Sequence, residues 1–318
     1  MFGTARRTRI AGLLLGYLAD IVLADPRAGH PVAGFGAAAA SLERFTYRDN
    51  RAAGAIHVAV LVGTVSLSGA ALERRARRFG AYGPVLITAL ASWVALGGTS
   101  LARIGSAMGE LLSRNDLEGA HRLLPSLCGR DPATLDVAGL TRATVESVAE
   151  NTSDAHVAPL LWAAAGGVPA VLGYRAVNTL DAMVGHRSPR YSRFGWAAAR
   201  SDDVANYLAA RVTAALTVMC APVVGGSPLR ALAAWRRDAR RHPSPNAGVV
   251  EAAFAGALGV RLGGPTQYRY ELQIRPALGD GPPPTVADVG RAVRLSRAVQ
   301  AAALVVACLS ARCQRRRP

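Results

Sequence analysis

Three acidic residues follow one another at helical spacing in a chain of net charge +16. Glu146, Glu150 and Asp154 are each four positions apart, with Asn151 and Arg142 close by. On an α-helix a step of four residues turns the side chain by only about 40°, so the acids should share a face. Like charges on one face repel. The pattern indicates either a Mg²⁺ site, which takes one or two carboxylates plus substrate phosphates, or a solvated helix face with Arg pairs.

A second polar block follows an apolar segment directly. Arg175, Asn178 and Asp181 recur every three residues and therefore share a helix face. Such a set suits the binding of a phosphate or a cation. The alternative is an Arg–Asp pair that only caps the end of a helix.

A third block places Arg200 just before the adjacent acids Asp202 and Asp203. Adjacent aspartates point to different faces of a helix, although Asn206 lies within reach of either. The alternative is structural, because acidic residues are also favoured in the first turn of a helix.

The fourth block is a proline-held turn at His242–Gly248. Its two prolines keep the backbone extended, so Asn246 is expected to cap a helix that runs through Glu251. With Ser244, such a helix start offers free N–H groups to phosphate. Gly263–Pro265 allows another close backbone approach, and near the N-terminus Asp25 and His30 supply an acid and an imidazole. Each of these is equally compatible with an ordinary loop.

The elements that must position these residues are helices in a membrane. The chain is 51% hydrophobic, and strand alternation is nowhere sustained. Windows of 18 to 24 residues without acid or arginine match the ~20 residues that cross a bilayer, and they are 52–72, 79–102, 155–174 and 212–229. The alternative is a soluble all-α protein with buried helices.

We therefore predict an all-α, polytopic membrane bundle that forms a single domain over residues 1–318. Polar inserts with amphipathic extramembrane helices are expected at about 103–154 and 230–295. The segment carrying Gly166–Pro169 either spans or re-enters the membrane, and the first helix is retained rather than cleaved as a signal. The expected membrane helices lie near 8–24, 53–72, 81–102, 156–174, 208–228 and 296–311.

Composition excludes several classes of function. The chain has no lysine, which rules out a P-loop lysine and a lysine Schiff base. Its arginines are scattered without interleaved aromatics, which argues against nucleic acid and suits anionic lipid headgroups. The four cysteines form no metal-ligand pattern, as expected for a protein that faces the cytoplasm.

These blocks together resemble the adenosylcobinamide-phosphate synthase (CobD/CbiB) family of cobalamin biosynthesis, over about residues 16–280. The matching motifs are Val145–Asp154, Tyr174–Asp181, His242–Gly248, Leu258–Pro265 and the front run Asp25-Pro26 to His30-Pro31-Val32. The chain departs from the family pattern at Ala24, at Ala155-His156, at Ala182 and at Tyr268-Arg269-Tyr270. None of these departures removes a carboxylate or an amide.

The resemblance implies a multi-pass enzyme of the cell membrane whose site faces the cytoplasm. It would be an acid–amine ligase that uses ATP and Mg²⁺ to join the propionate of adenosylcobyric acid, a corrinoid, to aminopropanol or its phosphate. The sequence leaves open whether the protein forms a homo-oligomer. The other classes are a non-catalytic membrane sensor of the same fold and a cation transporter.

The resemblance also guides a division of roles among the polar blocks. Metal and nucleotide would be held by Glu146, Glu150 and Asp154, together with Asp181 or with Asp202 and Asp203. Phosphate or substrate would be bound by Arg175, Arg200, Asn151, Asn178 and the turn from Ser244 to Asn246. The amine proton would pass to His30 or His242, because an imidazole titrates near neutral pH.

Overall fold

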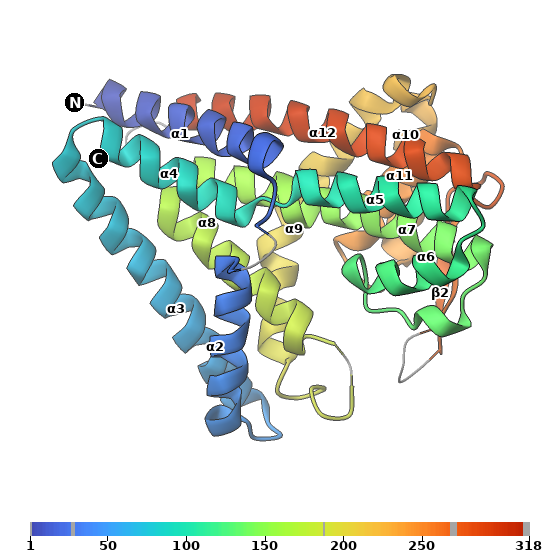
Figure 1. The fold of residues 1–318 in the computed structure, drawn as a ribbon, viewed down its shortest axis with the longest axis horizontal. Helices are drawn as coiled ribbons and strands as arrows, with labels where there is room; N and C mark the ends of the chain where they lie inside the picture. The colour runs from blue at the N-terminus through green and yellow to red at the C-terminus, as the bar shows by residue number, and fades with distance from the viewer. Residues whose placement is uncertain (1, 27–28, 187, 268–271, 314–318) are drawn as a thin grey trace. The chain divides into compact units, whose positions relative to one another are not determined.

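The computed structural model describes residues 2–26, 29–186, 188–267 and 272–313, which are almost entirely helical (Figure 1). The chain forms two compact units. Unit 1 comprises Met1–Gly97, Ala155–Asn206 and Leu304–Pro318, and unit 2 comprises Gly98–Asp154 and Tyr207–Ala303. The expectation of an all-α fold is confirmed apart from one small sheet. Tyr268-Arg269-Tyr270, where the family pattern is interrupted, lies outside the described residues.

Unit 1 is built from long helices that follow the charge-free windows of the sequence. They are α1 (Phe2–Leu23), α2 (Pro31–Thr46), α3 (Arg51–Ala76), α4 (Tyr82–Ala95), α8 (Ala158–Val184), the start of α9 (Trp196–Cys220) and the end of α12 (Val286–Cys313). A 3-10 turn, Arg77–Phe79, separates α3 from α4.

Helices α1 and α4 lie side by side at very close range (Figure 1). Two glycines one turn apart allow the approach, because a Cβ atom on Gly12 would lie 2.5 Å from Cβ of Thr88, and one on Gly16 would lie 2.7 Å from Cβ of Ser92. Small residues four positions apart are a common contact between membrane helices, because they let backbones pack closely.

Helix α8 is broken at the predicted glycine–proline segment. Gly167 has φ 69° and ψ −153°, a conformation that side chains strongly disfavour, and Pro169 has no N–H to donate. The break frees the carbonyl of Ala164, which accepts a hydrogen bond of 3.1 Å from Nη1 of Arg9. Side chains thus replace the lost helical bonds, as a broken helix in an apolar setting requires.

Unit 2 contains shorter helices and the only sheet found in the described residues. Its elements are α5 (Gly98–Ser113), α6 (Leu117–Leu123), α7 (Val137–Thr152), α10 (Pro228–Asp238), α11 (Ala247–Leu258), β1 (Leu262–Gln267) and β2 (Leu272–Leu278), with the rest of α9 and α12. Short 3-10 turns lie at Leu124–Ser126, Pro132–Thr134, Ala221–Val224 and Ala239–Arg241.

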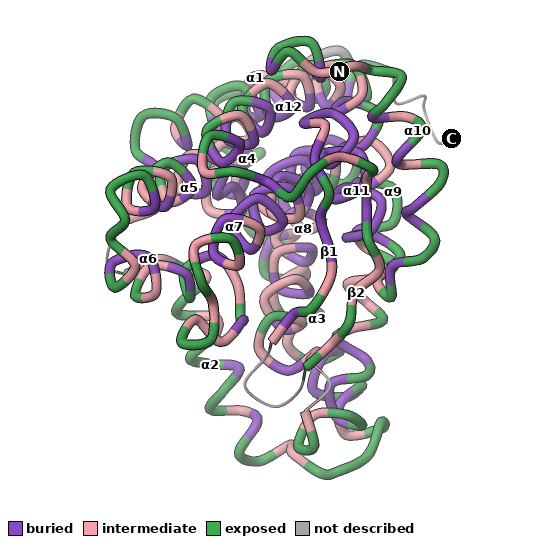
Figure 2. Tube along the Cα trace, turned by 90° about the vertical axis from the view of Figure 1, so that its right-hand side faces the viewer, coloured by how far each residue is buried: buried purple, intermediate pink, exposed green. Residues whose placement is uncertain are grey.

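Helix α11 is buried along its whole length, so Figure 2 draws it in purple throughout. Helix α10 and helix α7 pack against it. Its sequence is apolar except for Glu251, whose side chain is fully buried. Burial of a lone carboxyl in such a helix destabilises the fold unless the group is paired or neutral. The position of Glu251 therefore indicates that α11 has a role besides packing.

Strands β1 and β2 form an antiparallel pair that our sequence analysis missed. The register shifts between Leu262 and Gly264, and Gly263 and Gly264 have φ of 84° and 95°. A strand whose second and third residues are glycines in this conformation shows no alternation of apolar and polar residues, so its sequence gives no strand signal.

Within the described residues, five helical stretches are long and apolar enough to cross a membrane: Arg51–Phe79, Tyr82–Ser113, Val137–Val184, Trp196–Val224 and Val286–Cys313. This agrees with a multi-pass membrane protein. Helix α1, expected as a sixth span, is not among the five, because Arg6, Arg7, Arg9 and Asp20 interrupt its apolar surface. Two of the stretches also extend into residues 103–154, which we had expected to lie outside the membrane.

Candidate functional site

Glu146 lies at the centre of a buried polar cluster in unit 2. Its side chain is 1% exposed and forms an ion pair with Arg130, itself 5% exposed. Its other oxygen accepts a hydrogen bond of 2.7 Å from the backbone N–H of Gly263. Nε of Arg142 lies 4.0 Å away. Both carboxylate oxygens are therefore engaged by the protein, and a metal role for Glu146 would require it to exchange these partners.

The glycines of β1 bring the backbone against this cluster, as the sequence predicted for Gly263–Pro265. Nη1 of Arg142 donates to the carbonyl of Gly263 over 2.8 Å, and Nη2 donates to the carbonyl of Pro265. A Cβ atom on Gly264 would lie 2.9 Å from Nη1 of Arg142, so a side chain there would displace the guanidinium.

A second buried acid, Glu251 of α11, lies close to the first. It is 0% exposed, and neither of its carboxylate oxygens has a hydrogen-bond partner in the described residues. Nη1 of Arg275, on β2, is 3.7 Å from Oε1. Burial raises the pKa of Glu251 well above its usual range, and the charges of Glu146 and Glu150 raise it further.

Glu150 is the third carboxylate of this cluster. It is half-buried, one helical turn beyond Glu146 on α7, and its charge acts on Glu251. Over the described ranges of the chain its carboxylate forms no hydrogen bond and no ion pair, although its backbone carbonyl accepts from the N–H of Ser153. Asn151 beside it is occupied, because its Nδ2 donates to the carbonyl of Ser147 over 2.9 Å.

Asp154 lies beyond the helix that carries Glu146 and Glu150. Helix α7 ends at Thr152, and Ser153–Val157 is a π-helical turn. The expected stripe therefore crosses a change of helix type before it reaches Asp154, and its third member stays a prediction.

The turn at His242–Gly248 leads from α10 into α11 as predicted, although the capping side chain differs. Oγ of Ser244 accepts from the N–H groups of Asn246 and Ala247, at 3.3 Å and 3.1 Å. Asn246 occupies the N-cap position without making a capping bond, and its Oδ1 accepts from Nη1 of Arg211 over 2.8 Å. Two of the N–H groups that we expected to hold phosphate are thus already used.

His242 is 7% exposed and is held by the same turn. Its Nδ1 accepts a hydrogen bond of 3.1 Å from the N–H of Ser244, so the neutral ring carries its proton on Nε2, which has no partner in the described chain. Burial lowers the pKa of His242 to about 4, and the positive charge of Arg275 contributes. At neutral pH this imidazole is uncharged and offers a donor at Nε2.

His30 has a comparable arrangement in unit 1. It forms the N-cap of α2, where its Nδ1 accepts from the N–H of Val32 over 3.1 Å. Its Nε2 lies 3.4 Å from Oδ1 of Asp25. The neutral ring therefore has no free lone pair for an incoming proton.

Unit 1 also brings the second and third polar blocks of the sequence together. Nη1 of Arg175 donates to Oδ1 of Asn178 over 3.4 Å, and Nδ2 of Asn178 donates to Oδ1 of Asp202 over 3.2 Å. Asp181 is half-buried near the end of α8. This chain of contacts joins α8 to α9.

Arg200 and Asp203 form a local pair instead. Nη1 of Arg200 lies 3.2 Å from Oδ2 of Asp203, three residues along α9, and the Arg200 side chain is 64% exposed. Helix α9 begins at Trp196 and has no acidic residue in its first turn, so the alternative of a helix start at Asp202 and Asp203 does not apply.

Throughout the described residues, no three His, Cys, Asp or Glu side chains lie close enough together to hold a metal ion by themselves. The magnesium assignment of the acids therefore stays a prediction.

Sequence reasoning missed the basic and acidic partners that complete the cluster in unit 2. They are Arg130, Arg275, Arg211 and Glu251, which come from a loop, a strand and two helices. A signal was present for Glu251, since it is the only charged residue from Ala247 to Leu258. The three arginines carried none, because arginine occurs in every loop of this chain.

Comparison with known proteins identifies the same family that the sequence motifs resemble. The model of the CobD/CbiB protein family matches residues 13–296. A cobalamin biosynthesis protein CobD of Mycobacterium tuberculosis is 67% identical over 318 residues, which covers 100% of both chains. No solved structure matches the chain significantly.

More distant relatives carry the same name. The cobalamin biosynthesis protein CobD of Geobacter metallireducens is 42% identical over 277 residues, 85% of this chain and 86% of the relative. The protein of that name from Rhodobacter capsulatus is 41% identical over 284 residues, 88% of each chain. The similarity spans both units and includes every block described above, so the chain belongs to the CobD/CbiB family.

Proposed function

We propose that this protein acts in cobalamin biosynthesis as an ATP-dependent acid–amine ligase of the cell membrane, with its site facing the cytoplasm. It would join the propionate carboxylate of adenosylcobyric acid to aminopropanol or to aminopropanol phosphate. The family supports the pathway. The observation that carries the chemistry is Glu251, a fully buried carboxyl whose oxygens have no hydrogen-bond partner in the described residues.

The reaction needs two bond exchanges. An oxygen of the substrate carboxylate attacks the γ-phosphorus of ATP, and the bond to ADP breaks. The amine arrives as an ammonium group, so its nitrogen loses one proton before it attacks the resulting acyl carbon. Phosphate then departs with the electrons of the C–O bond, and the nitrogen loses a second proton to give the amide. The protein therefore has to neutralise phosphate charge and accept a proton from an ammonium group.

Glu251 suits the second task. An unpaired buried carboxylate is stabilised by any cation that reaches it, and the ammonium group of the amine is such a cation. The raised pKa of Glu251 brings its proton affinity towards that of the amine, which favours proton transfer. We assign the base to Glu251 rather than to His30 or His242, because each neutral imidazole has its Nδ1 lone pair occupied by a backbone N–H.

Glu150 suits Mg²⁺, since it has no other partner in the described chain and since Mg²⁺ commonly binds one or two carboxylates together with nucleotide phosphates. When bound, the ion would reduce the negative charge of the phosphates. Arg130 and Arg275 offset part of the negative charge of the acids. Nε2 of His242 is available as a hydrogen-bond donor to an oxygen that gains charge.

The direct test is a mass-spectrometric assay of the purified protein in detergent with adenosylcobyric acid, ATP, Mg²⁺ and each amine in turn. We expect a product joined by an amide bond and equimolar release of ADP. Absence of product with both amines would contradict the proposal. Glu150→Gln should abolish turnover, whereas Glu110→Gln, at an exposed acid of α5, should not.

A further inference from the structure

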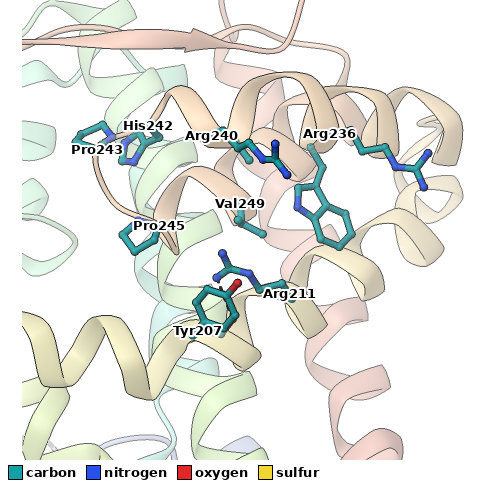
Figure 3. A pocket seen from close by; sticks show the side chains of 10 residues that line it. Tyr207, Arg211, Arg236, Arg240, His242, Pro243, Pro245 and Val249 are labelled. Atoms are coloured by element: carbon teal, nitrogen blue, oxygen red, sulfur yellow. Dashed lines mark hydrogen bonds between the residues drawn. The ribbon is translucent and has the colours of Figure 1, made fainter.

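A cavity of about 550 Å³ lies in unit 2 beside the turn that holds His242. Its walls come from α9, from α10 with the 3-10 turn that follows, and from the start of α11. Figure 3 shows Arg236 and His242 at opposite sides of the view, with Arg240 between them and Arg211 with Tyr207 on the facing wall. The volume lies within the range of sites for small molecules.

The charged side chains that line this cavity are positive. Of the described residues, Arg211, Arg236 and Arg240 line it, and no aspartate or glutamate does. In the described residues Arg236 and Arg240 have no acidic partner. Their neighbours Arg237 and Arg241 are different, because they pair with Asp238 at 2.8 Å and 3.5 Å. One face of α10 is therefore neutralised within the protein, and the face towards the cavity is not.

Arg211 is held in position although no carboxylate pairs with it in the part of the chain that the structure describes. Its guanidinium lies 3.6 Å over the ring of Tyr207 and donates to Oδ1 of Asn246 over 2.8 Å. It also donates to the carbonyl of Tyr207 over 2.9 Å. Arg211 belongs to the membrane-spanning candidate Trp196–Val224, where an arginine without a carboxylate is costly and indicates a functional anion.

Aromatic residues complete the wall. Trp235, on α10, is half-buried, and Tyr207, on α9, is 57% exposed. Flat rings next to guanidinium groups favour a ligand that has a planar ring and several phosphate oxygens. Aminopropanol phosphate has one phosphate and no ring, so it would leave most of this wall unused.

We propose that this cavity binds a nucleoside triphosphate, with its phosphates on Arg211, Arg236 and Arg240 and its base against Trp235. This inference rests on the proposed ligase function, because it assigns a place to the ATP of that reaction. The γ-phosphate would lie towards His242, whose surroundings include Glu146, Arg130 and Arg275 of the buried cluster. The nucleotide would thus end next to the acids that hold Mg²⁺ and the amine.

The test is photolabelling of the full-length protein in detergent with 8-azido-ATP, followed by mass-spectrometric mapping of the labelled peptides. We expect label between residues 207 and 249 that excess ATP removes. Label at other positions, or label that aminopropanol phosphate removes and ATP does not, overturns the proposal.

Variants give an independent measurement of affinity. Arg236→Gln and Arg240→Gln should each weaken ATP binding roughly tenfold, because each removes charge-assisted hydrogen bonds to phosphate. Arg230→Gln is the matched control, since Arg230 is an exposed arginine of the same helix that does not line the cavity. Equal affinity of all three variants and the unchanged protein overturns the site.

The two proposals fail in different ways. If the protein makes the amide and Arg236→Gln and Arg240→Gln bind ATP normally, the ligase stands and this site is wrong. If ATP labels the cavity and no amide forms with either amine, the site stands and the ligase is wrong.

Discussion

Oε1 of Glu251 lies 3.7 Å from Nη1 of Arg275, beyond hydrogen-bonding distance, and both side chains are largely buried. The arginine is close enough to lower the energy of a charged glutamate and too far to satisfy its oxygens. Asp238, a buried acid elsewhere in the same unit, is fully engaged by Arg237, Arg241 and the N–H of Gly279. The incomplete pairing of Glu251 is therefore a local feature that leaves room for a ligand.

Replacement of Glu251 by glutamine should separate catalysis from folding. Glu251→Gln keeps the shape and removes the proton acceptor, so we expect amide formation to fall by about a hundredfold or more. The fold should persist, because the variant removes a buried acid whose oxygens lack hydrogen-bond partners in the described residues. Turnover and the melting temperature in detergent measure the two effects. Full activity of Glu251→Gln would remove this residue from the mechanism.

The same variant should change how stability depends on pH. The pKa of Glu251 is higher in the folded than in the unfolded chain, so the folded state binds more protons above the ordinary glutamate pKa. Stability is then lost as the pH rises towards the folded-state pKa. Melting temperatures of Glu251→Gln should fall less steeply over that interval than those of the unchanged protein. Parallel curves would contradict the raised pKa.

His242 should change the pH dependence of stability in the opposite direction, because its effect appears as the pH falls. Its pKa is lowered to about 4 in the fold, so the unfolded chain binds more protons between about pH 6.5 and pH 4. Stability is therefore lost as the pH falls through this interval, by on the order of 3 kcal/mol. His242→Asn, which keeps an acceptor for the N–H of Ser244, should remove this loss, and His121→Asn should not. Thermal unfolding at several pH values measures the difference.

Removal of one partner from the buried ion pair of Arg130 and Glu146 should destabilise the fold much more than the same change in an exposed ion pair. Arg130→Met leaves a buried carboxylate without its cation and should destabilise the fold by about 3–5 kcal/mol. The double variant Arg130→Met with Glu146→Gln should recover much of this loss, since Gln keeps an acceptor for Gly263.

An exposed pair of the same kind is the control for that experiment. Arg122 and Glu118 are 66% and 86% exposed, so Arg122→Met should change stability by about 1 kcal/mol or less. Denaturant titration in detergent compares the variants. Equal losses of unfolding free energy in Arg130→Met and Arg122→Met would contradict the burial of Glu146.

The contact between α1 and α4 depends on glycine. In Gly16→Ala the new methyl would lie 2.7 Å from Cβ of Ser92 and 2.8 Å from the carbonyl of Ala89, so we expect a loss of about 1–3 kcal/mol. Gly34→Ala is the matched control, because nothing lies within 4 Å of its Cβ position on α2. This control should stabilise the protein slightly, since alanine favours helix. Melting temperatures that change alike would contradict the close packing.

Composition was sufficient to predict the long helices, but not the pair of strands β1 and β2. Charge-free windows predicted the long helices, because only a helix satisfies its own backbone groups in an apolar setting. The Gly166–Pro169 segment predicted the break in α8, since glycine and proline change the backbone locally. The ordered motifs predicted the family, which requires no knowledge of contacts.

Packing alone decided which of these polar residues meet. Glu146 accepts from Gly263, 117 residues away, and no spacing rule links positions so far apart along the chain. The π-turn after Thr152 and the conformation of Asn246, with φ −111° and ψ −55°, likewise result from how the helices join. The prediction of an acidic stripe assumed one regular α-helix from Glu146 to Asp154. The prediction of a cap assumed one particular backbone conformation at Asn246. Neither assumption takes account of tertiary packing, in which the burial of α11 places Glu251 beside the acids of α7.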